Sequence, residues 1–184
     1  NFKINNMKFL KYALLASTLI FASCTDENDT PPVVNEEEVI TTLTVTLDSG
    51  TDQIVLQYQD LDGEGSDPAV ITVSGTLSAN TVYDGSIVLL NEIEGENITE
   101  EVEEEADEHQ FFYTVGSGLN VTTDYNDADS MGNPLGLSFI LTTSEASSGA
   151  LTFTLRHEPN KPNSGLDNAG GETDIEITFN VTVQ

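Results

Sequence analysis

The sequence predicts an all-β domain: an antiparallel two-sheet sandwich of about nine strands, with at most one short acidic helix. Three observations lead to this prediction. From residue 39 onward, apolar and polar residues alternate in short runs, turn-forming residues separate the runs, and only one segment has apolar residues at helical spacing. Alternation with a period of two leaves one face of a strand buried and the other in water, which is typical of antiparallel sheets.

The predicted strands follow one another directly, without the helices that connect parallel strands. The final run is the clearest, because Ile175, Ile177, Phe179, Val181 and Val183 alternate with polar neighbours. Since turn residues separate the runs, we expect two sheets packed face to face. The predicted strands span residues 43–47, 54–58, 70–73, 82–90, 111–115, 119–125, 135–141, 151–155 and 175–183.

A short segment at the start of the fourth predicted strand refines the fold class. Leu77, Thr81 and Tyr83 resemble the beginning of a strand in fibronectin-type and other immunoglobulin-like domains. In those domains the tyrosine hydroxyl bonds back to the nearby backbone as a tyrosine corner. The resemblance implies an immunoglobulin-like sandwich, and it implies nothing about function because one fold supports many activities.

The acidic segment from Asn91 to Glu108 interrupts the alternation. Ile98, Val102 and Ala106 recur in it at helical spacing, so it predicts a short helix, with an extended acidic crossover as the alternative. Ten of its residues are acidic. They would either attract cations or a partner, or form a solvated face.

The N-terminal residues predict a secretory signal. Lys3, Lys8 and Lys11 accompany the start of an apolar run that continues to residue 22, and the first acidic residue is Asp26. A basic start, an apolar run that is short for a membrane span, and small residues before a cleavage point are typical of such signals.

Phe21-Ala22-Ser23-Cys24 resembles the lipobox of bacterial lipoproteins, with Phe21 where that family more often has leucine. The resemblance implies cleavage before Cys24, acylation of its thiol and acylation of the new N-terminus. More than one acyl chain anchors a protein stably to a bilayer. The alternative is a secreted protein without a lipid.

These features divide the chain into three predicted parts. Residues 1–23 are a signal peptide whose first six residues precede the expected start methionine, residues 24–38 are a lipidated acidic linker, and residues 39–184 are a single β-sandwich domain. The acidic residues that follow Cys24 resemble the export signal of surface lipoproteins of the Bacteroidetes. This implies display on the outer membrane at the cell surface, with a periplasm-facing anchor as the alternative.

The net charge excludes two classes of partner. The chain of 184 residues has 32 acidic residues and 5 basic ones. Signal cleavage would leave the 32 acids opposed only by Arg156 and Lys161, a formal charge of −30. A polyanion of this kind is repelled by nucleic acid and by anionic lipid, so we expect neither nucleic-acid binding nor electrostatic docking to a membrane.

Acidic loops are the first candidate metal sites. The loop from residue 60 resembles the opening of an EF-hand, but Ile71 stands where an EF-hand has its bidentate glutamate. We therefore expect a looser Ca²⁺ site shared with a neighbouring loop, to which residues 167–174 would add oxygens. The alternative is that Asp, Asn and Gly simply form tight turns here. The candidate calcium ligands are Asp60, Asp62, Glu64, Asp127 and Asp129.

The two histidines are the second candidate metal site. His109 follows the acidic segment, and His157 lies at a strand end beside Glu158. If the two strands are neighbours, both imidazoles and Glu158 could share one zinc or copper ion. The alternative is a pair of hydrogen-bonded histidines at the rim of the domain, because the sequence does not specify which strands are adjacent.

Catalytic motifs are absent from the sequence, which contains no Gly-x-Ser-x-Gly, no phosphate loop and no nucleophilic cysteine motif. We therefore expect a non-enzymatic binding or accessory module, held on the bilayer through Cys24, with an envelope protein or a glycan as its partner. A metal-binding lipoprotein is the alternative. A carboxylate-based glycan hydrolase is a third possibility, disfavoured because the chain has no tryptophan to form a sugar platform.

The stretches from Glu103 to Tyr113 and from Leu155 to Ile175 resemble a family of small flavobacterial lipoproteins of unestablished function. Members of that family are named as type 1 periplasmic-binding-fold proteins. That name implies a longer chain in which strands alternate with helices. Because strands follow strands here, the residues favour the sandwich.

Overall fold

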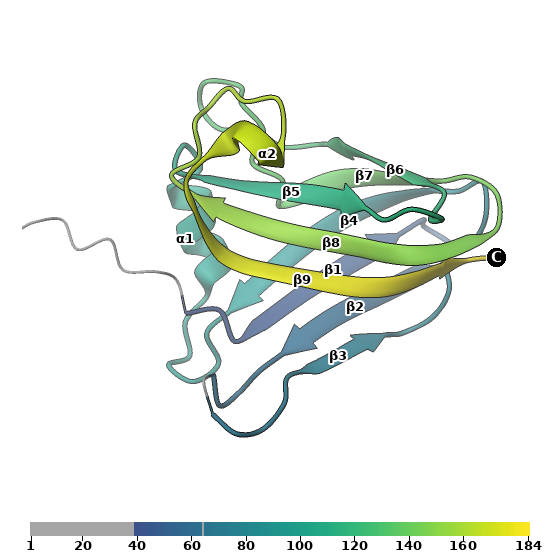
Figure 1. The fold of residues 1–184 in the computed structure, drawn as a ribbon, viewed down its shortest axis with the longest axis horizontal. Coiled ribbons are helices and arrows are strands. Elements are labelled where there is room, and N and C mark those ends of the chain that lie inside the picture. The colour runs from purple at the N-terminus through teal and green to yellow at the C-terminus, as the bar shows by residue number, and fades with distance from the viewer. Residues whose placement is uncertain (1–38, 64) are drawn as a thin grey trace, which may run out of the picture. The chain divides into compact units, whose positions relative to one another are not determined.

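The computed structural model describes residues 39–63 and 65–184, which form two antiparallel sheets packed face to face (Figure 1). The predicted all-β sandwich is therefore confirmed. The predicted signal peptide, Cys24 and the acidic linker lie outside the described residues. No helix among the described residues has the length and apolar character needed to cross a membrane.

Nine strands and two helices make up the described chain. The larger sheet contains β1 (Thr42–Asp48), β2 (Gln53–Gln59), β3 (Val70–Val73), β4 (Val82–Leu90), β6 (Val121–Tyr125) and β7 (Ser138–Thr143). The smaller sheet contains β5 (His109–Val115), β8 (Ser147–His157) and β9 (Glu172–Val183). The helices are α1 (Ile98–Glu104) and α2 (Leu166–Ala169).

The strand order is β3-β2-β1-β4-β7-β6 in one sheet and β5-β8-β9 in the other. Constant-type immunoglobulin domains divide seven strands into four and three. The division into six and three supports the sandwich architecture, while the immunoglobulin-like assignment stays a prediction. The predicted tyrosine corner is present, because the backbone N–H of Ser78 donates to the hydroxyl of buried Tyr83 at 2.8 Å.

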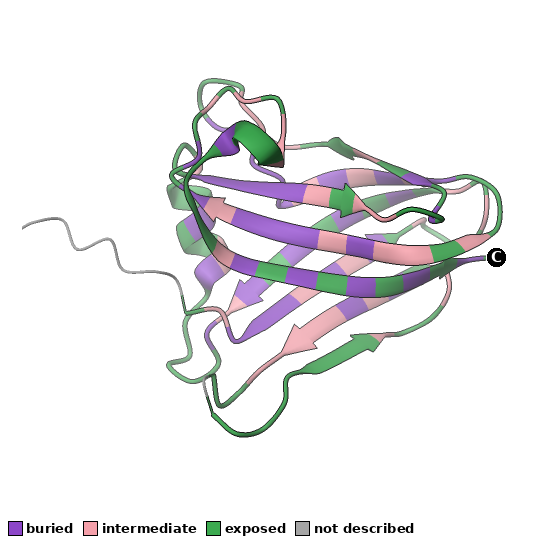
Figure 2. Ribbon diagram, viewed as in Figure 1, coloured by how far each residue is buried: buried purple, intermediate pink, exposed green. Residues whose placement is uncertain are grey.

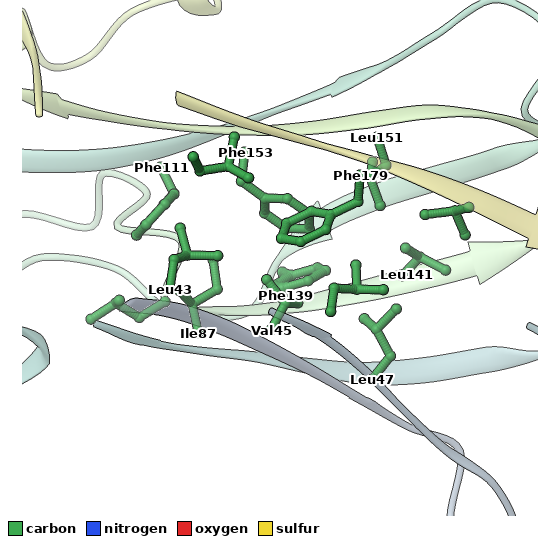
Figure 3. Packing of buried hydrophobic residues seen from close by; sticks show 14 of the residues in the cluster. Leu43, Val45, Leu47, Ile87, Phe111, Phe139, Leu141, Leu151, Phe153 and Phe179 are labelled. Carbon is green, nitrogen blue, oxygen red and sulfur yellow. The ribbon is translucent and has the colours of Figure 1, made fainter. Parts of the chain in front are cut away.

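The core lies between the two sheets and follows from the alternation. Along β9, buried and exposed residues alternate as predicted (Figure 2). Phe139 of the larger sheet meets Phe153 of the smaller one with ring centroids 5.8 Å apart, and Phe153 contacts Phe179 in an edge-on arrangement (Figure 3). Gly85 makes room for this cluster, since a Cβ atom there would lie 2.4 Å from the Phe139 ring.

The acidic segment forms the predicted short helix, α1, which buries Ile98 and Val102 against the core. Asn97 precedes the helix and its side-chain amide donates to the Glu100 carboxylate at 2.8 Å. The expectation of at most one helix was wrong, because α2 adds a single turn. Four residues are too few to produce a helical period in the sequence.

Different contacts connect the two sheets along the two long sides of the sandwich. On one side, Leu77 bridges to the end of β9, accepting from the N–H of Gln184 at 2.9 Å and donating to Thr182 at 2.8 Å. On the other side, the edge strand β5 is tied across to the larger sheet by the Tyr125 hydroxyl, which donates to the carbonyl of Phe111 at 2.8 Å. The loops that precede β7 and β9 lie on this second side, beside the candidate sites.

Candidate metal centre

His109 and His157 lie directly opposite each other in the register of β5 and β8. Opposite residues of an antiparallel pair point to the same face, here the core-facing one that Phe111 also occupies. Their imidazole rings stack with centroids 4.6 Å apart and planes inclined by 20°. Both side chains are buried. The strand adjacency on which the sequence-based hypothesis depended is therefore present.

A β-bulge brings Asp174 to the same place. Ile175 and Thr173 face consecutive residues of β8, so Asp174 is an extra residue between them. In a regular strand, Asp174 would point to the same side as exposed Glu176. A bulge re-aims a side chain by adding one residue, and the Asp174 carboxylate is fully buried beside the two imidazoles.

His109 begins β5, His157 ends β8 and Asp174 lies near the start of β9, and their side chains come together there. Figure 1 shows these strand ends at the same end of the sandwich as α1 and α2. The Asp174 carboxylate is 3.9 Å from Nε2 of His109 and 4.0 Å from Nδ1 of His157. Each side chain offers one ligand atom, and these atoms all lie within 4.8 Å of one another. Within the described part of the chain, neither Nε2 of His109 nor Nδ1 of His157 has a hydrogen-bond partner.

The protonation of His109 can be assigned from its surroundings. Its Nδ1 lies 3.2 Å from the carbonyl oxygen of Glu105 at the end of α1. A carbonyl only accepts, so Nδ1 carries the proton and Nε2 presents its lone pair to Asp174. Burial lowers the pKa of His109, which favours this neutral form. A histidine that binds metal through one nitrogen commonly donates from the other to such a carbonyl.

The spacing fits a shared cation better than hydrogen bonds. Separations of 3.9 and 4.0 Å between nitrogen and oxygen exceed hydrogen-bond distances. Two ligands that each lie about 2.0–2.2 Å from one zinc ion are between about 3 and 4.4 Å apart. An ion shared by both imidazoles needs their planes to converge, and rotation of one ring about its soft χ2 torsion would supply this.

A second, exposed group shares His157 with the first. Nε2 of His157 lies 3.9 Å from the carboxylate of Glu108, and Glu158 completes this group. Both glutamates are exposed, whereas Asp174 is buried. Glu158 was predicted to join both imidazoles. The structure instead groups it with His157 and Glu108, while Asp174 joins the two histidines.

Gly171 allows β9 to begin directly against the end of β8. Its φ is +70°, and a Cβ atom there would lie 2.1 Å from the carbonyl oxygen of His157. Glycine at such a place commonly marks a bulge or a close backbone approach. The pair Gly170-Gly171 ahead of Asp174 is a sequence signal of this kind, but residues 167–174 were predicted only to add oxygens to a calcium site.

The first predicted calcium loop has a different geometry. Asp62 accepts the backbone N–H of Asp67 at 3.0 Å, as in a tight turn, and Asp60 lies 3.4 Å from the hydroxyl of Tyr58. Glu64 lies outside the described residues. Among the described residues, neither aspartate belongs to a cluster of three side chains that could hold a metal.

The second predicted calcium loop has carboxylates that already accept hydrogen bonds. Asp127 accepts the backbone N–H groups of Gly136 at 2.6 Å and Ser138 at 2.7 Å. These bonds fix the loop before β7. Calcium binding at Asp127 stays a prediction, and it would require this carboxylate to share its oxygens with the ion.

Asp129 forms a buried ion pair with Lys161, whose Nζ lies 3.6 Å from Oδ2 of the carboxylate. Burial acts to raise the pKa of Asp129, but hydrogen bonds from Asn133 and Met131 and the charge of Lys161 outweigh it and lower the pKa. Lys161 also donates to the carbonyl of Ala106 at 2.6 Å. A calcium ion at Asp129 would have to displace this lysine.

Comparison with known proteins gives no relative from which a function could be transferred. The chain matches no model of a protein family, no curated protein and no solved structure. The functional argument therefore depends on the geometry of the chain itself.

Proposed function

We propose that the chain is a cell-envelope lipoprotein whose sandwich domain is a non-enzymatic module that binds a zinc or copper ion through His109, His157 and Asp174. One observation carries the metal proposal. Two buried imidazole nitrogens that have no hydrogen-bond partner among the described residues lie within 4.0 Å of one carboxylate. A divalent cation among these atoms would satisfy the lone pairs of both nitrogens.

The donor set favours a transition metal over calcium. Two nitrogens and one carboxylate oxygen suit zinc or copper, whereas calcium takes six to eight oxygen ligands. Three protein ligands leave a fourth position for water or an external ligand, as in exchangeable zinc sites. The only cysteine is the predicted lipid-attachment residue, so no thiol is expected to compete for the ion.

The exposed group offers the ion a route to the buried one. Glu108 lies at the surface on the Nε2 side of His157, with Glu158 in the same exposed group, and Asp174 lies on the Nδ1 side. The formal charge of −27 attracts cations toward the whole chain. We expect an incoming ion to meet the two glutamates first and then to move past the His157 ring to Asp174.

Titration of the full chain carrying Cys24→Ala tests metal binding without a lipid or a thiol. Zn²⁺ should bind with one ion per chain, and Asp174→Asn should weaken binding at least tenfold. Glu176→Gln is the matched control, since Glu176 lies two residues along the same strand and belongs to neither metal group. Equal affinities for the two variants, with both folded by circular dichroism, would refute the site.

The spectrum of bound Cu²⁺ shows directly how many imidazoles bind the ion. Because the chain has two histidines, the Cu²⁺ electron paramagnetic resonance spectrum of the Cys24→Ala chain should show hyperfine coupling to two nitrogens. His157→Gln should reduce this to one. Coupling to two nitrogens in that variant would mean that the ion binds elsewhere.

The lipoprotein proposal is supported by the basic start, the apolar run and the position of the single cysteine. In the native host, Cys24→Ala should move the protein from the membrane fraction to the soluble fraction. Protease treatment of intact cells should digest the anchored protein if it is displayed at the surface. Complete protection would favour the periplasm-facing alternative, and membrane retention of the variant would exclude acylation of Cys24 as the anchor.

A further inference from the structure

A cleft on the β5 and β6 side of the sandwich is separate from the metal centre. Its larger part, about 580 Å³, lies between the outer surface of β5, strand β6 and the loop that contains α2. It continues into a part of about 230 Å³. The two parts share Phe112, Tyr125, Ser164 and Gly165, so they form one groove. None of the three metal-centre residues lines it.

The lining of the groove differs from the rest of the molecule in charge. The chain has 32 acidic residues, but Asp167 is the only carboxylate among the lining residues, which include no lysine or arginine. Side-chain amides and hydroxyls take the place of charges. A groove of this composition selects a neutral, polar ligand, because an ionic ligand would find almost no charged partner there.

Tyr125 forms the exposed aromatic wall of the groove, and Phe112 lies in the same lining, almost fully buried. Phe112 points away from the core yet is 4% exposed, because the loop at 162–168 lines the groove beside it. Tyr125 is 38% exposed. Its hydroxyl donates to the carbonyl of Phe111 at 2.8 Å, which fixes the ring before any ligand arrives.

Polar groups in the groove are available for a ligand. Among the described residues, the side chains of Thr114, Thr123 and Asp167 accept or donate no hydrogen bond. The Asn168 side chain is held in place by Ser164, whose backbone N–H donates to Oδ1 of Asn168 at 3.2 Å. The groove thus combines a fixed aromatic wall with hydroxyl and carboxylate groups that can pair with ligand hydroxyls.

We propose that this groove binds a short segment of a neutral glycan. A sugar ring presents an apolar C–H face to an aromatic side chain and hydroxyls to polar ones, which is the combination found here. The groove binds without hydrolysing, because glycoside hydrolysis commonly uses two carboxylates that flank the bond and Asp167 is the only one in the lining. This inference is independent of the metal centre.

The test is calorimetry of the full Cys24→Ala chain with neutral hexasaccharides of glucose, mannose, galactose and N-acetylglucosamine, and with polygalacturonate as the anionic probe. At least one neutral hexasaccharide should bind, and polygalacturonate should not. The double variant Thr114→Val, Thr123→Val should weaken binding about tenfold, the effect of losing about 1.4 kcal/mol. These substitutions conserve shape at side chains without hydrogen bonds, so folding should be kept.

A second pair of variants distinguishes loss of the aromatic ring from loss of folding. Tyr125→Leu should abolish binding, whereas Tyr125→Phe, which keeps the ring, should retain most of it. His157→Gln should leave glycan binding unchanged, and the threonine variants should leave zinc binding unchanged, so either proposal can fail alone. The inference is overturned if no neutral hexasaccharide binds, if a neutral peptide displaces the bound sugar, or if binding survives both the threonine and the leucine variants.

Discussion

At the scale of single residues, the proposed metal centre lies close to a residue that has no side chain. Gly171 lets the start of β9 lie against the His157 carbonyl, three residues before the bulge at Asp174. Alternation predicted which residues of β9 are buried from Ile175 onward. It could not predict the burial of Asp174, because one inserted residue reverses the face of everything before it.

Gly171→Ala should therefore be more harmful than an alanine that is merely placed at a positive φ. Alanine at positive φ destabilises a protein by more than about 0.4–1 kcal/mol, and the added Cβ at 2.1 Å from a backbone oxygen forces a further shift. Gly50→Ala is the control, since Gly50 has φ +79° and nothing within 4 Å of the added atom. Denaturant unfolding and zinc titration should show a larger loss for Gly171→Ala; equal losses would contradict the contact.

The buried pair of Asp129 and Lys161 gives the domain a pH dependence. Hydrogen bonds and Lys161 lower the pKa of Asp129 below its usual 3.8, despite burial that acts to raise it. A carboxylate with a lowered pKa in the folded state stabilises the fold above its unfolded pKa, and this stability is lost as pH falls through the folded value. Asp129→Asn should thus be less stable than wild type at pH 7, and the difference should shrink as the pH falls below 3.8. A difference that grows on acidification would contradict the assignment.

At the scale of elements, the sequence predicted which strands and helices exist better than it predicted which strands pair with one another. Nine runs of alternation became nine strands, and the acidic segment became α1, because both patterns are local. The pairing of β5 with β8 depends on contacts between residues 36 to 48 positions apart, so the sequence could name His109 and His157 but could not bring them together. The groove was missed for the same reason, because β5 and the loop that contains α2 are distant in the sequence.

The tyrosine corner connects the segment before β4 to the core. Tyr83→Phe removes the acceptor of the Ser78 N–H while keeping the buried ring. Loss of one such hydrogen bond should lower the free energy of unfolding by about 0.5–1.5 kcal/mol. Tyr58→Phe is the control, because the Tyr58 hydroxyl makes only a long contact of 3.4 Å with Asp60. Urea unfolding should separate the two variants; an equal and negligible effect of both would show that the corner contributes nothing.

At the scale of the whole molecule, most of the acidic residues lie around an apolar core. The described residues bury a continuous apolar cluster between the sheets, with the acids on the outside and in the loops. The groove, the proposed metal centre and the buried pair of Asp129 and Lys161 are places where this pattern changes. The proposed function places a self-repelling domain on a lipid tether, with binding confined to such places.

Zinc should stabilise the whole domain, because the centre joins β5, β8 and β9. An ion that binds only the folded state contributes about 2.7 kcal/mol at a concentration of 100 Kd. For a domain of this size, that corresponds to a rise in Tm of roughly 5–10 °C. Calorimetric scans with Zn²⁺, Ca²⁺ and chelator should show the rise for zinc alone, and a larger rise for calcium would favour the acidic loops.

Histidine NMR tests the metal centre most directly, since the full Cys24→Ala chain has two imidazoles to observe. Without metal, His109 should show the proton on Nδ1, as its contact with Glu105 requires. One equivalent of Zn²⁺ should shift Nε2 of His109 and Nδ1 of His157 together to metal-bound values. If neither nitrogen shifts with excess zinc, or if only Nε2 of His157 does, the proposed centre of His109, His157 and Asp174 is wrong.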